Sequence, residues 1–200
     1  MREPFLQFVE NNLEDRFLLI ACGLPGSYKT ETTEVVAHIK GCSILRSDLL
    51  RLEVLKNEDI FDEKVAANMD KRTMVYDEMF RRADEILEKN DNVILDATFV
   101  TQVLRKRAAA VAAGRNRTFV ILQTDCHQEV SIKRILKRTK ENYESNALTE
   151  KAYLNNKERF EQVDFKDLKN LNPTLSIVHL IVNTEEDPPE YWYITSVDKN

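Results

Sequence analysis

The chain has 200 residues, of which 42% are hydrophobic and 32% are charged, and its formal net charge is −5. This length suffices for one well-buried α/β domain and is short for two, and the composition is that of an ordinary globular protein. Three cysteines without C-x-x-C spacing argue against a disulfide framework or a structural zinc site. We therefore expect a single domain over residues 1–200, with an N-terminal helix within residues 1–16 and an acidic tail over residues 183–200.

The N-terminal segment and the distribution of charge bear on location and partners. The first 16 residues lack the basic start and apolar stretch of a signal peptide, and no apolar run approaches the ~20 residues of a membrane span. These features predict a cytoplasmic protein without a membrane segment. Residues 101–140 carry ten Lys/Arg and two Asp/Glu, a net charge of +8, so the remainder carries −13. The sequence thus has no globally basic coat for nucleic acid, but it has a local basic strip that could face phosphates.

Apolar runs and helical patterns alternate along the chain. Residues 17–22 read FLLIAC, a continuous apolar run of strand length that glycine ends, which is typical of a strand buried on both faces. Further strands are predicted over 42–45, 93–95, 118–122 and 175–182. Helices are predicted over 30–40, 47–55, 64–89, 101–113, 128–140 and 149–160. This alternation predicts an α/β fold with a mostly parallel, doubly wound sheet.

The sharpest motif is residues 23–30, which read GLPGSYKT between the first predicted strand and the following helix. A phosphate-binding P-loop needs this context, because its inward-pointing N–H groups and the helix N-terminus together hold phosphate oxygens. In such a loop Lys29 reaches the β- and γ-phosphates of ATP, and the Thr30 hydroxyl ligates Mg²⁺. The expected nucleotide contacts are Gly23, Pro25, Gly26, Ser27, Tyr28, Lys29, Thr30 and Glu31.

One position departs from the usual G-x-x-x-x-G-K-[ST] pattern, because Tyr28 stands where glycine precedes the lysine. Two interpretations stay open. The side chain either crowds the β-phosphate or covers the loop from outside.

The acceptor side of the predicted site follows the second strand, where residues 47–51 read SDLLR. In a doubly wound sheet this segment lies beside the phosphate loop, at the carboxyl ends of the strands. Asp48 there can accept the proton of an attacking hydroxyl, and Arg51 can hold an anionic group of the acceptor. The alternative role for Asp48 is a partner of the helix N-terminus, but its position after a P-loop favours the functional interpretation.

Asp96 ends the third predicted strand, and Thr98 follows it. A carboxylate at the end of a buried strand is costly unless it is paired. Asp96 therefore binds a magnesium-coordinated water, orients the acceptor, or simply hydrogen-bonds a neighbouring turn. Thr98 is a candidate for an acceptor contact.

The basic helix predicted over 128–140 places Arg134 and Arg138 four residues apart, on one side. Two arginines there can clamp the transferring phosphoryl group, whereas an ordinary charge run is solvated. The concentration of positive charge favours the clamp. Arg105 is a further candidate for an acceptor contact.

Taken together, GLPGSYKT, SDLLR, LDATF and a helix with R-x-x-x-R resemble the standalone predicted ATP-dependent kinases of the P-loop superfamily, related to zeta toxins and to the kinase domain of polynucleotide kinases. The resemblance runs from about Phe17 to Val182. It implies a five-stranded parallel sheet of order 2-3-1-4-5, helices on both faces and a mobile arginine lid. It also implies that Asp48 is the general base, that Arg51 binds a neighbouring phosphate, and that Arg134 and Arg138 are the lid arginines.

The sequence thus predicts a kinase that uses ATP and Mg²⁺ to phosphorylate a hydroxyl of a small molecule or nucleotide-like acceptor. One alternative is a kinase of 5′-hydroxyl nucleic acid ends. The other is a nucleotide-binding regulator that has lost catalysis, for which only Tyr28 argues. The sequence does not indicate an oligomeric state.

Overall fold

The computed structural model describes residues 2–56, 58, 65, 68–89, 91–138 and 147–200. Within these residues one sheet has seven strands, in the order β1-β7-β6-β5-β2-β4-β3. The strands are β1 (Glu3–Pro4), β2 (Phe17–Cys22), β3 (Ser43–Arg46), β4 (Val93–Asp96), β5 (Thr118–Asp125), β6 (Ile177–Asn183) and β7 (Tyr193–Lys199). All six residues of the central strand β2 are buried, as its uninterrupted apolar sequence predicts.

The predicted count of five strands is wrong. The five predicted strands are adjacent and parallel in the order β3-β4-β2-β5-β6, but β7 pairs antiparallel with β6, and β1 pairs antiparallel with β7. The residues expected to form an acidic tail therefore fold back as an edge hairpin. Pro188 precedes a 3₁₀ turn over Pro189–Tyr191, which reverses the chain direction.

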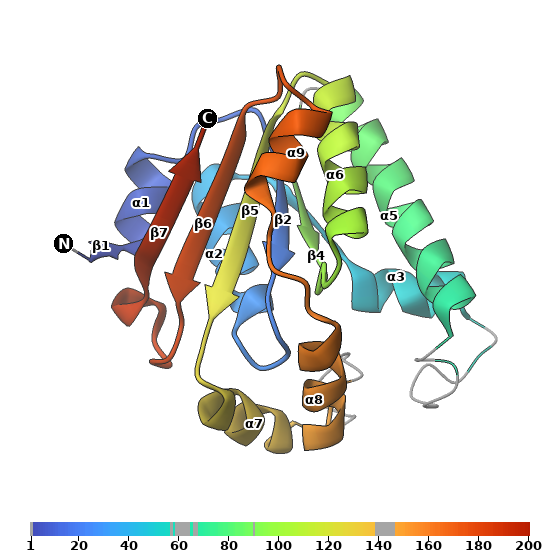
Figure 1. Cartoon of the computed structure of the whole chain (residues 1–200), viewed down its shortest axis with the longest axis vertical. Coiled ribbons are helices and arrows are strands. Elements are labelled where there is room, and N and C mark those ends of the chain that lie inside the picture. The colour runs from blue at the N-terminus through green and yellow to red at the C-terminus, as the bar shows by residue number, and fades with distance from the viewer. Residues whose placement is uncertain (1, 57, 59–64, 66–67, 90, 139–146) are drawn as a thin grey trace.

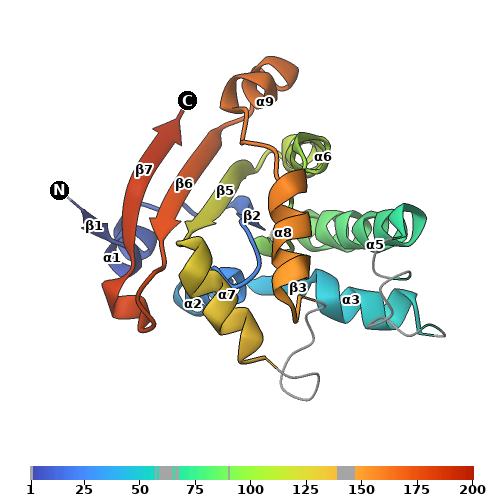
Figure 2. The same ribbon diagram turned by 60° about the horizontal axis from the view of Figure 1, so that its bottom comes forward.

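Helices cover both faces of the sheet (Figure 1). They are α1 (Phe5–Asn11), α2 (Lys29–Lys40), α3 (Ser47–Val54), α5 (Met69–Glu88), α6 (Gln102–Gly114), α7 (Gln128–Leu136), α8 (Glu150–Arg159) and α9 (Phe165–Leu171). The helices α1 and α2 share one hydrophobic cluster with Trp192, whereas α5, α6 and α9 share another on the opposite face. Figure 2 shows α7 and α8 in front of the carboxyl ends of the parallel strands, the edge where the predicted site residues lie.

One predicted helix boundary differs from the structure in a way that affects the site. The helix α3 begins at Ser47, the first residue of the predicted helix over 47–55, and Arg46 in the cap position makes no side-chain cap bond. The basic helix α7 ends at Leu136, so Arg138 lies beyond it, and residues 139–140 of the prediction fall outside the described residues. The helix α8 begins one residue after the predicted start, and Thr149 caps it, because its side chain accepts a hydrogen bond from Ala152 N. None of the described helices combines the length and apolar character that crossing a membrane requires.

Candidate active site

The phosphate loop connects β2 to α2, and two glycines allow its path. Gly23 and Gly26 have φ values of 147° and 79°. A Cβ at Gly26 would lie 2.4 Å from the backbone oxygen of Ser131 in α7, so no other residue fits there. Ser27 is buried and holds the loop closed, because its hydroxyl donates to Leu24 O at 2.7 Å and shares a hydrogen bond of 2.6 Å with Thr124 at the end of β5. The tip of the central sheet therefore fixes the shape of the loop.

Lys29 and Thr30 open α2 and point into this edge of the sheet. The Lys29 ammonium donates to Leu24 O at 2.9 Å, and the Thr30 hydroxyl donates to Asp96 Oδ2 at 2.8 Å. Burial lowers the pKa of Lys29, while the Asp96 carboxylate opposes that shift. The first-turn N–H groups of α2 have no intrahelical acceptor, and together with the lysine they suit a polyanion such as a nucleotide phosphate chain.

Tyr28 adopts a left-handed conformation with φ 57° and ψ 36°, which explains why glycine usually occupies this position. Its ring contacts α7 and the C-terminal hairpin. The Cζ atom of Arg134 lies 3.7 Å from the ring centroid, the Trp192 ring lies 5.6 Å away, and the hydroxyl donates to Asp187 Oδ1 at 2.8 Å. The tyrosine thus covers the loop on its hairpin side, whereas Thr30 faces Asp96.

Asp48 lies in the first turn of α3, beside the end of β3. Its carboxylate is 3.8 Å from the guanidinium of Arg51. Desolvation raises the pKa of Asp48, Arg51 lowers it as the second effect, and Asp96, Lys29 and Arg138 also act on this carboxyl group. The structure therefore brings together the predicted acceptor-side carboxylate and the predicted phosphate-binding residues.

Asp96 ends β4 and is only 7% exposed. Desolvation raises its pKa, and the hydrogen bond from Thr30 together with the charges of Lys29 and Arg46 opposes the shift. Arg46, which sequence analysis did not select, lies 4.0 Å from Asp96 Oδ2 and also pairs with Glu34. The hydroxyl oxygen of Thr30 and the carboxylate of Asp96 are hard oxygen donors of the kind that Mg²⁺ prefers.

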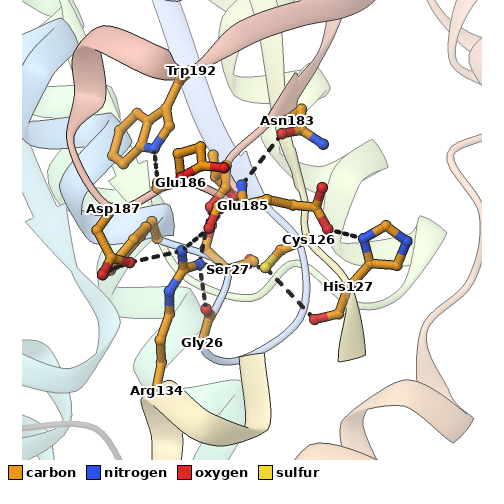
Figure 3. Close-up of polar contacts among 12 residues, drawn as sticks. Gly26, Ser27, Cys126, His127, Arg134, Asn183, Glu185, Glu186, Asp187 and Trp192 are labelled. Atoms are coloured by element: carbon orange, nitrogen blue, oxygen red, sulfur yellow. Dashed lines mark hydrogen bonds and ion pairs between the residues drawn. The ribbon is translucent and has the colours of Figure 1, made fainter. Parts of the chain in front are cut away.

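The structure separates the two predicted lid arginines. The Arg134 guanidinium donates to the backbone oxygens of Gly26, Thr184 and Glu185 at 3.3, 3.0 and 2.7 Å, and to Asp187 Oδ1 at 3.1 Å (Figure 3). It therefore fastens the phosphate loop to the segment after β6. Arg138 follows the end of α7 and no longer shares a helix side with Arg134. Its charge acts on Lys29, Glu31 and Asp48.

The prediction that Arg105 contacts the acceptor is wrong on this geometry. Its side chain is fully buried, and its guanidinium makes five hydrogen bonds, four of them to backbone oxygens. These bonds tie Phe99 and Val100 to Glu161 and Gln162, so Arg105 joins two loops and has no donor left for a ligand. Thr98 lies near Tyr76 of α5: burial raises the pKa of Tyr76, and the Thr98 side chain opposes that shift.

Sequence reasoning missed several residues that shape the phosphate loop from the C-terminal segment. Thr184 donates to Ser27 O at 2.9 Å, and the Trp192 indole donates to Glu186 O at 2.7 Å. His127 and Glu185 form an ion pair beside them (Figure 3). The acidic composition of this segment hides its role, and the one available signal was the tryptophan of the Tyr191–Tyr193 run.

A phosphate loop between the central strand of this sheet and the helix that follows it is the arrangement that defines P-loop nucleotide-binding proteins. The comparisons agree with this class. The chain belongs to the AAA domain family, whose profile matches residues 18–163. No curated protein matches it.

Solved structures share the fold at low sequence identity. A gluconokinase from Sinorhizobium meliloti 1021 superposes with a TM-score of 0.61 at 16% identity, covering 88% of this chain and 87% of that one. A sugar kinase from Janibacter sp. HTCC2649 has a TM-score of 0.61 at 17% identity, covering 88% and 89% of the two chains. Kti12 from Chaetomium thermophilum, solved in complex with ADP-AlF3, has a TM-score of 0.58 at 19% identity, covering 80% and 87%.

Proposed function

We propose that the protein is an ATP-dependent kinase that transfers the γ-phosphoryl group to a hydroxyl of a small acceptor. The observation that carries this proposal is the 2.8 Å hydrogen bond from Thr30 to Asp96, beside Lys29 and within electrostatic range of Asp48. It joins the nucleotide side of the site to the acceptor side. The kinase fold of the family and of the two sugar-kinase structures supports the same conclusion.

The nucleotide side is built from the phosphate loop. The N–H groups of residues 26–30 and the Lys29 ammonium would hold the phosphates. Arg134 connects the loop at Gly26 to Glu185, so the segment after β6 would support the loop. Thr30 and Asp96 would hold Mg²⁺, which supplies charge neutralisation on the phosphate oxygens.

The acceptor side supplies the proton acceptor. The acceptor oxygen forms a bond to the γ-phosphorus, the bond from the γ-phosphorus to the bridging oxygen breaks, and ADP leaves. The proton of the hydroxyl moves to the Asp48 carboxylate, whose raised pKa makes it a stronger base than an ordinary aspartate. Arg138, whose charge acts on both Lys29 and Asp48, is suited to stabilise the negative charge of the phosphoryl group during its transfer.

A 5′-hydroxyl nucleic acid end is the second candidate acceptor, and the +8 segment over residues 101–140 favours it. Several arginines of that segment are already engaged within the protein. Arg105 is buried, Arg107 pairs with Asp77, and Arg115 lies 2.6 Å from Asp84. This engagement leaves less of the strip for phosphates, so a small acceptor is the better supported substrate.

An ATP-consumption screen tests the proposal directly. Sugars, sugar phosphates, nucleosides and 5′-hydroxyl oligonucleotides would each be incubated with the protein, ATP and Mg²⁺, with Lys29→Ala as the matched inactive control. We expect ADP formation that depends on one acceptor class and on Lys29. ATP binding without acceptor-dependent ADP formation in any class would instead favour the regulator that has lost catalysis.

A further inference from the structure

Three arginines from three different helices meet on the acceptor side of the candidate site. They are Arg51 in α3, Arg72 in α5 and Arg159 at the end of α8, and we call them the arginine cluster. The guanidinium of Arg72 lies within electrostatic range of the other two. A hydrogen bond also places Arg159 near Arg72. Arg159 donates to the sulfur of Met69 at 3.2 Å, and Met69 lies one turn before Arg72 in α5.

The surrounding structure fixes these positions. The helix α3, which carries Arg51, packs against α5. The end of α8 is anchored two residues after Arg159, where Glu161 N donates to Val100 O at 2.8 Å and Arg105 binds Glu161 O at 2.7 Å. Tyr76, one turn after Arg72, packs edge-on against Phe99 at 5.5 Å. The arginine cluster therefore stands beside the β4–α6 loop that carries Thr98.

The charge of the arginine cluster is not balanced by the part of the protein that the structure describes. Asp48 is the carboxylate that pairs with it, through Arg51 at 3.8 Å. The Arg72 side chain forms no hydrogen bond or ion pair with any described residue, and burial together with Arg159 and Arg51 lowers the pKa of Arg72. Three guanidinium groups beside one carboxylate leave two positive charges. Holding like charges together costs free energy unless an anion joins them.

We propose that the arginine cluster binds a phosphomonoester group of the acceptor, so that the substrate is a small hydroxylated molecule that already carries a phosphate. A phosphomonoester carries about −1.5 to −2 charges at pH 7, which matches the two unbalanced positive charges. A carboxylate or a phosphodiester carries only one negative charge and would leave the site positive. Guanidinium groups also match the geometry of phosphate oxygens. Because Asp48 lies next to Arg51, an acceptor whose phosphate is bound by the arginine cluster would place its free hydroxyl near the Asp48 carboxylate, the proposed base. This inference rests on the proposed kinase function and adds the class of its acceptor.

Matched acceptor pairs test the substrate class. ATP consumption would be compared for ribose and ribose 5-phosphate, glycerol and glycerol 3-phosphate, and gluconate and 6-phosphogluconate. We expect a phosphorylated member to be consumed with a kcat/KM at least about 10-fold above its unphosphorylated partner, since its phosphate would form charge-assisted hydrogen bonds with the arginine cluster. A kinase that prefers the unphosphorylated members, or an oligonucleotide with a 5′-hydroxyl end, would overturn the inference while leaving the kinase activity established.

Variants of the arginine cluster test the binding role. Arg72→Met and Arg159→Met should raise the KM for the phosphorylated acceptor about 10- to 100-fold and change the KM for ATP little. Arg81→Met is the matched control, because Arg81 lies in the same helix but is exposed and paired with Glu78 and Glu85. If Arg72→Met, Arg159→Met and Arg81→Met all had the same KM for the phosphorylated acceptor, that result would contradict the proposed phosphate site. If Arg72→Met fails to fold, Arg72→Lys keeps the charge and should retain a KM within a few-fold of the wild type, and Arg159→Met provides the loss.

Inorganic phosphate gives a readout that does not need turnover. With saturating ADP on the phosphate loop, added inorganic phosphate should raise the melting temperature of the wild type and of Arg81→Met, but less that of Arg72→Met and Arg159→Met. The same rise in all four proteins would contradict the site. A difference among them without any acceptor-dependent ADP formation would uphold the anion site and refute the proposed kinase function.

Discussion

The guanidinium of Arg134 stacks on the ring of Tyr28, with its Cζ atom 3.7 Å from the ring centroid. This contact, with the Trp192 ring at 5.6 Å on the same tyrosine, supports a left-handed residue where P-loops usually have glycine. The left-handed conformation costs a non-glycine residue roughly 1–2 kcal/mol. A cation–π contact and an aromatic pair each contribute about 0.5–1.5 kcal/mol, so together they offset that cost.

Replacing Tyr28 separates the two effects. Tyr28→Gly removes both the strain and the ring contacts, whereas Tyr28→Ala removes only the contacts. We expect the free energy of unfolding of Tyr28→Ala to lie about 1 kcal/mol below that of Tyr28→Gly, measured by urea denaturation. ATP affinity of Tyr28→Gly should equal or exceed that of the wild type, because the ring lies on the hairpin side of the loop. Equal stability of the two variants would mean that the backbone leaves the left-handed region in solution.

Trp192 tests whether the C-terminal hairpin is part of the fold. It is 1% exposed, and its indole donates to Glu186 O at 2.7 Å. Trp192→Ala should lower the free energy of unfolding by about 3–5 kcal/mol, the usual cost of emptying a large core site. Its neighbour Tyr191 is 64% exposed, so Tyr191→Ala should change stability by less than about 0.5 kcal/mol. A small effect at Trp192 would show that the acidic segment is only loosely attached.

Arg134 and Arg138, the two predicted lid arginines, should have different kinetic roles. Arg134 binds backbone oxygens of the phosphate loop and of Glu185, so Arg134→Met should raise the KM for ATP and lower stability. Arg138 acts on Lys29 and Asp48, so Arg138→Met should lower kcat by about 10²-fold or more with a smaller change in the KM for ATP. Steady-state kinetics of the two variants would check this division, and identical profiles would argue for one shared clamp.

Local sequence patterns sufficed to predict the parallel strands and the phosphate loop. The run from Phe17 to Cys22 is apolar throughout and is followed by a glycine-rich loop. The predicted strand, turn and helix therefore match the elements of the structure there. The same agreement holds for Asp48 and Asp96, because residues after parallel strands gather at one edge of the sheet.

The errors have a common cause, because each depends on contacts between distant segments. Arg105 looks like a surface arginine of a basic helix, yet backbone oxygens of Glu161 and Gln162 lie close enough to bury it. The hairpin strand β7 is polar on one side and follows two prolines, so its pairing with β6 leaves only a weak local pattern. Arg72 and Arg159 are 87 positions apart in the chain, and only the packing of α8 near α5 unites them.

Asp48 offers a test in which activity and stability move in opposite directions. Asp48→Asn keeps the shape of the side chain and removes the base, so kcat should fall by about 10²- to 10⁴-fold while ATP affinity stays nearly unchanged. Desolvation raises the pKa of Asp48 above its ordinary value, so the folded state binds this proton more tightly than the unfolded state does. The ionised carboxylate therefore destabilises the fold at neutral pH, and the asparagine variant should be more stable than the wild type there. This advantage should shrink as the pH falls through the raised pKa, and it should vanish below the ordinary one.

The pH dependence of the reaction supplies the matching kinetic signature. In the wild type, kcat/KM should fall on the acid side at a higher pH than an ordinary aspartate would give, because protonated Asp48 cannot accept the hydroxyl proton. In Asp48→Asn that acid limb should be absent from the residual rate. Asp96→Asn is the contrasting variant. It removes the negative charge that would help hold Mg²⁺ beside Thr30, so it should weaken the affinity for ATP in the presence of Mg²⁺ instead. If Asp96→Asn alone lost kcat and the acid limb while Asp48→Asn kept both, Asp48 would be a partner of the α3 N-terminus and the base would lie at the end of β4.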